Sequence, residues 1–392
     1  MPAADLSLLP LLAAAGFASG AGMRVLDPLL PQIAADFGTS VAALAAMVAG
    51  FALAYGAGQL VTGPLGDRFG KLRVATIALL LYGLGLAVTA FMPDLPAMMA
   101  ARIASGLLAG AVIPLAMAWI GDAVPYAERQ ATIGRFLTGM VMAQLVAGPI
   151  SGVVAEAAGW RASFLLLAVL ALGVGAVLMQ RLRARRAEPP RGGGGLGLGQ
   201  YLTLLERPGG RRLLLAGLVD GFALFGGAFP FVGSFLIEGF GLSAAAAGLA
   251  VAGFGIGALV YTRLARRLVA RVGERGLVTA GGALLALVLA GLALAPAWWV
   301  VAGLQVLCGL GFYMFHGVLQ ARATETLPEA RATAVSAFAM ALFLGQSLGS
   351  LGFGAVLHAG GYRAVFAGAA LVAALLVLWA RRRLFARSAT AP

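Results

Sequence analysis

Twelve apolar segments follow one another along this 392-residue chain, and they restrict its fold more than any other feature. A helix of about 20 apolar residues spans the roughly 30 Å of hydrocarbon in a bilayer. Only 11% of the residues are charged, against roughly a quarter in an average chain, so a bilayer is the solvent that fits. The segments are 6–30, 40–62, 74–92, 96–120, 131–154, 162–180, 213–237, 244–264, 277–295, 298–321, 332–357 and 364–380.

A polar stretch divides these segments into two groups of six. It carries several arginines, the Pro189-Pro190 pair and a glycine run at 192–195, a composition typical of a flexible linker, with a short surface helix at 198–205. We therefore expect an all-α membrane protein whose twelve transmembrane helices form two six-helix bundles related by pseudo-twofold symmetry. The expected domains are an N-terminal bundle at 1–180, a cytoplasmic linker at 181–212 and a C-terminal bundle at 213–392.

The positive charges are distributed unevenly over the two sides of the predicted membrane protein. Alternate loops on one side, together with the linker and the C-terminal tail, hold 24 of the 28 Lys and Arg residues. By the positive-inside rule, both termini and the linker are expected in the cytoplasm. The net charge of +13 fits a lipid surface, and because basic patches interleaved with aromatic residues are missing, we expect no nucleic-acid partner.

The two halves of the chain also repeat one another in sequence. At a shift of 203 residues Val48-Ala49-Gly50-Phe51 matches Val251-Ala252-Gly253-Phe254, and at a shift of 202 Gln144 matches Gln346. Bundles that repeat in the same orientation place a substrate site at their interface, near the bilayer midplane. Further matched pairs are Gly70 with Gly273, Gly106 with Gly309, Gly159 with Gly361 and Arg161 with Arg363.

The loop between the second and third apolar segments reads Gly63-Pro64-Leu65-Gly66-Asp67-Arg68-Phe69-Gly70-Lys71-Leu72-Arg73. It resembles the loop between helices two and three of the major facilitator superfamily, whose pattern is G-x-L-a-D-r-x-G-r-k-x. Only Gly66 departs from the pattern, where alanine is usual. The matching residues are Gly63, Leu65, Asp67, Arg68, Gly70 and Lys71.

This resemblance implies a cytoplasmic gate. Asp67 would cap the positive N-terminal end of the eleventh helix near Ala332–Ala334, and Lys71 or Arg68 would pair with Asp122 at the end of helix four. The alternative is a basic turn that only obeys topology. In the second copy Ala270 replaces Asp67 and Glu274 replaces Lys71, so we do not expect the second half to lock in the same way. The predicted gate comprises Gly63, Asp67, Arg68, Gly70, Lys71 and Asp122.

Charged residues inside predicted spans of the first half include Arg24, Asp27 and Arg102. Arg102 lies in helix four and, with Gly106, resembles the R-x-x-x-G stretch of the same superfamily. Arg24 and Asp27 are i,i+3 neighbours late in helix one, at about the same outer depth. A charge within a span needs a partner, so we expect an Asp27–Arg102 or Asp27–Arg24 cluster. It would sense protons or hold the outer half in register, or it is a structural ion pair at the membrane edge.

Asp220 is the one carboxylate predicted well inside a span of the second half, roughly 12 Å into helix seven at helical rise. An apolar environment favours the neutral form of a carboxyl group, which suits a site that loads and unloads a proton. A carboxylate in helix seven is similar to the coupling acid of several drug/proton antiporters. The alternative is a carboxyl group bonded to backbone at the cytoplasmic mouth. His316 in helix ten is a second titratable candidate, or a core histidine bonded to a carbonyl.

Other candidate residues concern substrate and direction. Gly148-Pro149-Ile150-Ser151-Gly152 resembles part of the G-P-x-x-G-G antiporter signature, through Gly148, Pro149 and Gly152, but lacks its glycine pair. Glutamines at 144 and 346 suit the orientation of a ligand or hydrogen bonding between helices. The predicted cavity lining is soft and mainly aromatic: Phe17, Tyr55, Met140, Gln144, Phe222, Phe225, Phe229, Met314 and Gln346.

Phosphate-binding P-loops and hydrolase motifs are absent from the sequence, so we expect a transporter and not an enzyme, with no catalytic residues. Its single cysteine, Cys308, excludes disulfides and thiolate metal sites; we expect no cofactor or metal, with protons as the coupling ion. We predict a monomer in the bacterial inner membrane, surrounded by lipid, that exports amphipathic small molecules by proton antiport. Alternatives are an importer of a sugar, amino acid or organic acid, a lipid or lysolipid flippase, and a membrane sensor.

Overall fold

The computed structural model describes residues 6–183, 198–327 and 330–385, and over these ranges the chain is helical without β-strands. The proline pair and the glycine run of the predicted linker lie outside the described residues. Nine stretches of the described chain are long and apolar enough to cross a membrane. Two of these nine stretches contain an internal turn and therefore cross twice, and the 16-residue helix α1 adds one more apolar helix. The predicted twelve spans are confirmed.

The first bundle contains the helices that precede the linker. Helix α5 shows how its ends are set: Asp94 Oδ1 accepts a hydrogen bond from the Ala97 N–H at 2.8 Å, and a proline lies in the first turn. The elements are η1 (Leu6–Leu8), α1 (Leu9–Arg24), α2 (Leu30–Asp36), α3 (Ala45–Phe69), α4 (Lys71–Ala90), α5 (Leu95–Ala123), α6 (Tyr126–Ala158) and α7 (Trp160–Arg183).

The second bundle follows α8, the predicted surface helix. Its first span begins at Pro208, five residues before the predicted start, and passes through a π-helix, η2, in its middle. The bounds predicted for the bundles and the linker remain a prediction. The elements are α8 (Leu198–Glu206), α9 (Pro208–Asp220), η2 (Gly221–Ala228), α10 (Phe229–Phe240), α11 (Ala244–Val251), α12 (Gly253–Leu294), α13 (Trp298–Thr326) and α14 (Arg331–Arg383).

Four turns between adjacent spans depend on glycine in a conformation that other residues rarely adopt. Gly70 has φ of 93° and its repeat partner Gly273 has φ of 65°; Gly159 has φ of 82° and its partner Gly361 has φ of 73°. The chain therefore turns at the same two positions of each half, as the sequence repeat predicts. Gly273 and Gly361 divide α12 and α14 into two antiparallel spans each.

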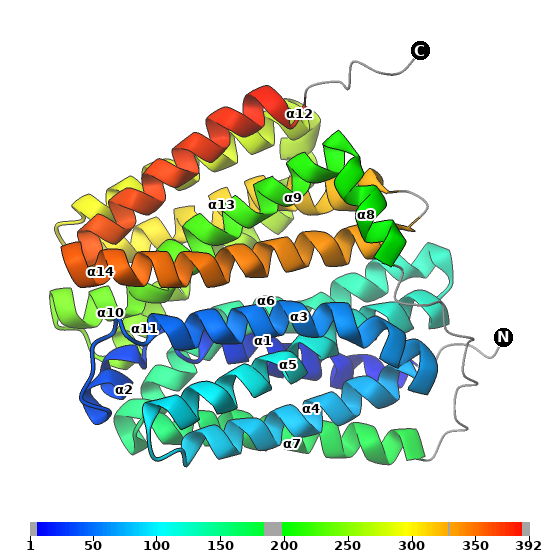
Figure 1. Ribbon diagram of the computed structural model, residues 1–392, viewed down its shortest axis with the longest axis horizontal. Helices are drawn as coiled ribbons and strands as arrows, with labels where there is room; N and C mark the ends of the chain where they lie inside the picture. The colour runs from blue at the N-terminus through cyan, green and yellow to red at the C-terminus, as the bar shows by residue number, and fades with distance from the viewer. Residues whose placement is uncertain (1–5, 184–197, 328–329, 386–392) are drawn as a thin grey trace.

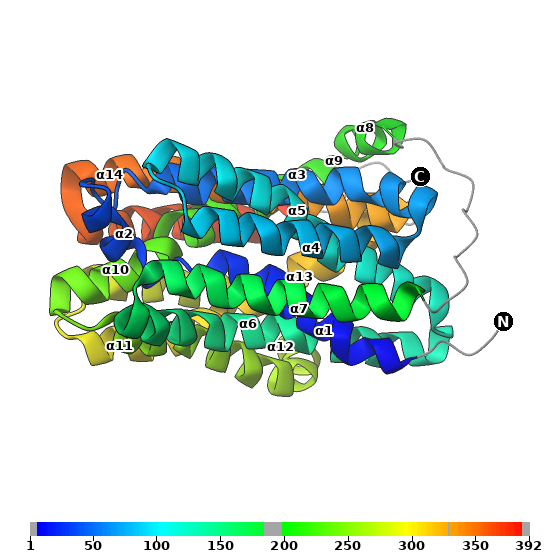
Figure 2. The ribbon, with the colours of Figure 1, turned by 90° about the horizontal axis from the view of Figure 1, so that it is seen from below.

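The two bundles lie side by side, with their helices running along the long axis of the molecule (Figure 1). At one end of the molecule α1 begins, α14 ends and α8 lies; we call it the arginine-rich end, because the helix ends there carry Arg68, Arg207, Arg322 and Arg381. We call the opposite end, marked by α2, α10 and α11, the outer end, after the topology that the positive charges predict. Figure 2 shows α8 at the edge of the molecule at the arginine-rich end, where its buried Leu204 packs against Leu327 and Ala334.

Glycines bring helices into close contact, while large apolar side chains face outward. A Cβ at Gly106 would overlap the Phe51 carbonyl, and one at its repeat partner Gly309 would overlap the Phe254 carbonyl, so the α3–α5 contact recurs between α12 and α13. Many large apolar side chains are exposed, as expected of helices that face lipid. Examples are Leu84, Val169, Leu249, Leu287, Leu371 and Leu378.

Candidate transport site

Asp220 and His316, which the sequence offered as separate candidates, form one pair inside the second bundle. The Oδ2 atom of Asp220, the last residue of α9, lies 2.8 Å from Nδ1 of His316 in α13. Their side chains are 3% and 11% exposed. The imidazole stacks on Phe312 at 4.6 Å between ring centroids and is tilted against Phe338. The histidine therefore bonds a carboxyl group, not a backbone carbonyl, and the pair can share or exchange a proton.

The π-helix η2 begins at the residue after Asp220 and carries an aromatic cluster. Phe225 lies in η2 and Phe229 begins α10, and both pack against Phe254 of α12 with centroid distances of 6.0 and 4.9 Å. Phe225 also meets Phe312, the ring beneath His316, edge to face at 4.9 Å. Single π-helical turns are common at functional sites. The Asp220–His316 pair is thus joined to the aromatic cluster through both the backbone and ring packing.

Arg24 of the first bundle reaches this aromatic cluster of the second. Its Nη1 lies 3.2 Å from Oδ2 of Asp27, and its guanidinium carbon lies 4.4 Å from the Phe229 ring centroid and 5.3 Å from that of Phe225. Cation–π contacts are stronger when water is excluded, and both charged side chains are buried. A Cβ at Gly233 would overlap the Asp27 carbonyl, so the bundles touch closely here. We call this contact the outer latch.

Arg102 does not join the outer latch as one of the predicted alternatives had it; Asp27 pairs with Arg24 instead. The Arg102 Nη2 atom donates to the Gly22 carbonyl at 2.9 Å, and its guanidinium lies over Phe51 at 4.0 Å and Phe164 at 5.5 Å. Within the described part of the chain its Nε and Nη1 have no hydrogen-bond partner. Arg102 therefore connects α1, α3, α5 and α7 of the first bundle and carries an unneutralised buried charge.

The predicted gate residues meet at the arginine-rich end. Lys71 Nζ contacts a carboxylate oxygen of Asp122 and lies 3.5 Å from Oδ1 of Asp67, whereas Arg68 lies over the Phe69 ring at 5.1 Å. Of the two cations offered for Asp122, the structure selects Lys71. These contacts connect the turn at Gly70 to the end of α5 within the first bundle.

Part of the gate prediction falls outside what the structure describes. Asp67 was expected to cap the helix that starts near Ala332–Ala334; the side chain of Ala332 lies outside the described residues, so this remains a prediction. Gly63 belongs to α3, but its surroundings also lie outside what the structure describes.

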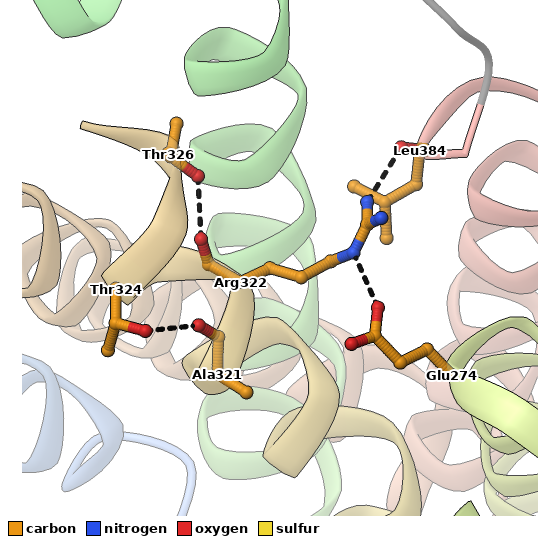
Figure 3. Close-up of polar contacts among 6 residues, drawn as sticks. All are labelled: Glu274, Ala321, Arg322, Thr324, Thr326 and Leu384. Carbon is orange, nitrogen blue, oxygen red and sulfur yellow. Dashed lines mark hydrogen bonds and ion pairs between the residues drawn. The ribbon is translucent and has the colours of Figure 1, made fainter. Parts of the chain in front are cut away.

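The second copy of this loop keeps an ion pair, with the charges exchanged. Glu274, the counterpart of Lys71, accepts a hydrogen bond from Arg322 Nε at 3.1 Å, and Arg322 Nη1 donates to the Leu384 carbonyl at 3.1 Å (Figure 3). The Lys71–Asp122 pair joins α4 to α5, and the Glu274–Arg322 pair joins the matching helices of the second half. In the second copy the carboxylate thus lies just after the turn, where the first copy has the lysine, and the cation lies on the following helix.

The antiporter-like residues lie where the two bundles meet. A Cβ at Gly152 would overlap backbone atoms of Ala244, and Gly248 of α11 packs against the Gly148 carbonyl. Pro149 lies inside α6 between these contacts. The small residues therefore allow α6 and α11 to approach at the outer end. Sequence reasoning missed Glu156, whose carboxylate accepts a hydrogen bond from the Ala245 N–H at 2.6 Å across the same interface.

Some predicted lining residues lie between the bundles. The Tyr55 ring of α3 packs on Phe343 of α14 at 4.8 Å, and its hydroxyl lies 3.1 Å from Ser19 Oγ. Gln346, by contrast, is buried on α14 against η2 within the second bundle, where its backbone carbonyl would overlap a Cβ at Gly226. Gln144 Oε1 is buried and has no partner among the described residues.

Other predicted lining residues face different surroundings. Phe17 lines an apolar cavity of about 220 Å³ between α1, α6 and α7, inside the first bundle. Met314 packs against Gly281 in the second span of α12, and Phe222 packs on Phe353 of α14 at 5.4 Å. Met140 packs beside Gly20 of α1. Helical position alone did not distinguish these surroundings.

Two helical bundles that meet through small residues and enclose buried ionisable groups define a secondary membrane transporter. A sequence model described as Major Facilitator Superfamily matches residues 12–227 and 213–391. The chain belongs to this superfamily.

Comparisons with individual proteins agree with this assignment. The chain is 30% identical to the inner membrane transport protein YdhP of Escherichia coli, over 94% of both chains. Its fold resembles an inward-facing bacterial homologue of the lysosomal transporter Spinster, with a TM-score of 0.76, 17% identity and 98% coverage of both chains. It also resembles a D-xylose-proton symporter, with a TM-score of 0.74, 19% identity and coverage of 95% and 97%. The chain is therefore a multi-pass membrane transport protein and not an enzyme.

Proposed function

We propose that this protein is a proton-coupled antiporter that exports amphipathic small molecules from the bacterial cytoplasm by alternating access. The observation that carries the proposal is the buried 2.8 Å contact between Asp220 and His316. Buried ionisable groups inside spans are costly and usually mark ion or proton pathways. With a neutral imidazole and a carboxylate, the uptake of one proton neutralises the pair, and its release restores a buried negative charge.

The route from this pair to the outer latch gives the proton a mechanical effect. Asp220 is followed directly by η2, whose Phe225 stacks against Arg24 together with Phe229. A change of charge at the start of η2 therefore acts on the element that holds the bundles together. In the proposed cycle, protonation releases substrate outward and favours the closed outer end, and deprotonation toward the cytoplasm resets the carrier. Proton and substrate must differ in affinity between the two states for this coupling to occur.

The expected substrate class follows from the side chains near the interface. Tyr55 and Phe343 meet between the bundles, and Gln144 offers an amide oxygen that has no partner in the described part of the chain. Aromatic surfaces with a few polar groups suit amphipathic molecules. Export is supported by Gly148, Pro149 and Gly152, which match part of the antiporter signature and whose two glycines contact α11. Both termini and the linker are proposed to lie in the cytoplasm, by the positive-inside rule.

The test is uphill transport of a panel of amphipathic dyes in proteoliposomes under an imposed pH gradient. We expect Asp220→Asn to abolish gradient-driven accumulation, down to the level of empty liposomes, while dye binding persists. Glu325→Gln, an exposed carboxylate at the arginine-rich end, is the matched control and should transport normally. If Asp220→Asn still accumulates dye against its gradient, the pair is not the coupling site.

A further inference from the structure

A cavity of about 410 Å³ opens at the arginine-rich end of the second bundle, between the start of α9 and the ends of α13 and α14. Asp220 lies at the opposite end of α9, so this cavity is separate from the proton-binding pair. It combines two guanidinium groups, a hydroxyl group and an apolar floor. The lining residues are Arg207, Pro208, Gly209, Gly210, Leu213, Arg322, Thr326 and Leu384.

Both arginine side chains are held in place by the protein. Arg322 is fixed by Glu274 and by the Leu384 carbonyl (Figure 3). Its guanidinium also lies 4.3 Å from the Phe385 ring centroid. Arg207 Nη1 donates to the Thr326 carbonyl at 3.3 Å. Cations whose geometry is fixed in advance lose less conformational entropy on binding an anion than free surface arginines do.

The first turn of α9 adds to the positive potential of the cavity. Pro208 occupies the first helical position and Gly209 follows with no described atom near the position of a Cβ, whereas Gly210 is buried against Leu204. The first N–H groups of a helix have no intrahelical acceptor and carry the positive end of its dipole. Two arginines from different segments and a helix start thus converge on one cavity.

We propose that this cavity binds the phosphate group of an anionic phospholipid in the leaflet at the arginine-rich end. Guanidinium groups bind phosphate through paired, charge-assisted hydrogen bonds. A lipid is the favoured source because α8, beside the cavity, exposes Leu202 and Leu205 at 60% and 47%, as an interfacial helix does against acyl chains. The positive-inside rule assigns this end to the cytoplasmic leaflet, whose anionic lipids attract basic clusters.

The test measures binding of dioctanoyl phosphatidylglycerol to the detergent-solubilised full chain by native mass spectrometry, with dioctanoyl phosphatidylcholine and inorganic phosphate as parallel probes. Gly209→Asp is the principal variant. No described atom lies within 4 Å of the position of a Cβ there, and a carboxylate in the first turn favours helix formation, so the variant should fold. Arg207→Gln removes one guanidinium, and Arg211→Gln, an exposed arginine outside the cavity, is the control of equal charge change.

We expect phosphatidylglycerol to bind the wild type and Arg211→Gln with equal affinity. Its affinity for Gly209→Asp and for Arg207→Gln should be lower by a factor of about ten or more, since the loss of one charge-assisted contact is worth that factor. Phosphatidylcholine should bind weakly to all four proteins. Equal binding of phosphatidylglycerol to all four would overturn the proposal, as would equal binding of both lipids. Inorganic phosphate that binds as tightly as the lipid would contradict the lipid assignment.

Discussion

At the scale of single residues, the buried charges of this transporter are stabilised in three different ways. Asp220 contacts an imidazole, Arg24 contacts both Asp27 and two phenylalanine rings, and Arg102 has only a backbone carbonyl and rings. A buried charge that loses its partner costs far more than a surface charge. The group with a titratable partner is the one suited to gain and lose a proton, which is why the proposed mechanism centres on Asp220.

Asp36, on the short helix α2 outside the spans, gives a pH-dependent prediction. Trp160 Nε1 and Arg161 Nη1 each donate to its Oδ2 at 2.7 Å, and these hydrogen bonds lower the pKa of Asp36 below its usual value. A lowered folded-state pKa stabilises the protein above the unfolded pKa, and the stabilisation disappears as pH falls through the folded value. Because the pair is 42–45% exposed, its contribution is about 1 kcal/mol or less.

We expect Asp36→Asn to lower the melting temperature of the detergent-solubilised protein at neutral pH, by a few degrees at most. The difference from wild type should narrow as the pH falls below about 4, where the carboxylate of the unfolded chain takes up a proton, and disappear as the pH passes the lower pKa of the folded state. Thermal melts of both proteins over a pH series measure this. A difference that stays constant down to the most acidic sample would show that the carboxylate charge is not involved.

The sequence indicated which residues belong to the site, but it did not always indicate which of them contact one another. Arg24 and Asp27 could be paired in advance because three residues separate neighbours on one helix face. Asp220 and His316 could not be paired, because they are 96 residues apart and their depths depend on where each helix begins. Phe17 and Met314 were predicted to line the central cavity, but each lies within one bundle. Their positions could not be predicted, because helical periodicity does not say which neighbour a helix face will meet.

At the scale of elements, the four glycine turns show that the sequence repeat reflects a shared backbone conformation. Gly70→Ala would place a side chain at φ of 93°, a conformation that costs roughly 1–3 kcal/mol for a residue with a Cβ. We expect a lower melting temperature for this variant. Gly121→Ala, inside α5 with no described atom near its Cβ position, is the control and should leave stability unchanged or raise it slightly. Equal melting temperatures for both would contradict the account of the turn.

The number and order of spans could be predicted from hydrophobicity, whereas their irregularities could not. The π-helix η2 adds one residue per turn locally and changes which faces of α9 and α10 point inward, and apolar composition carries no sign of this. The first span was predicted to run to residue 30, whereas α1 ends at Arg24 and the separate short helix α2 begins at Leu30. Phe225 of η2 belongs to the outer latch, so an irregularity that the sequence did not predict lies close to the proposed mechanism.

At the scale of the whole molecule, the described contacts between bundles cluster toward the outer end. The outer latch, the α6–α11 contact and the approach of Gly354 in α14 to Ala45 in α3 all lie there. By contrast, the arginine-rich part of α12 exposes Val260, Arg263 and Arg267. This arrangement has the outer end closed, and alternating access requires these contacts to separate while each bundle stays intact.

The central claim, that protonation of the Asp220–His316 pair controls the outer contact, is tested most directly by a distance across that contact. Spin labels at Ala35→Cys in α2 and Arg363→Cys in α14 occupy exposed outer positions, and the native Cys308 is buried. Pulsed dipolar spectroscopy in nanodiscs should show longer distances gaining population as the pH rises in the wild type, and a pH-independent short distance in Asp220→Asn. A variant that keeps the wild-type pH response would contradict the account.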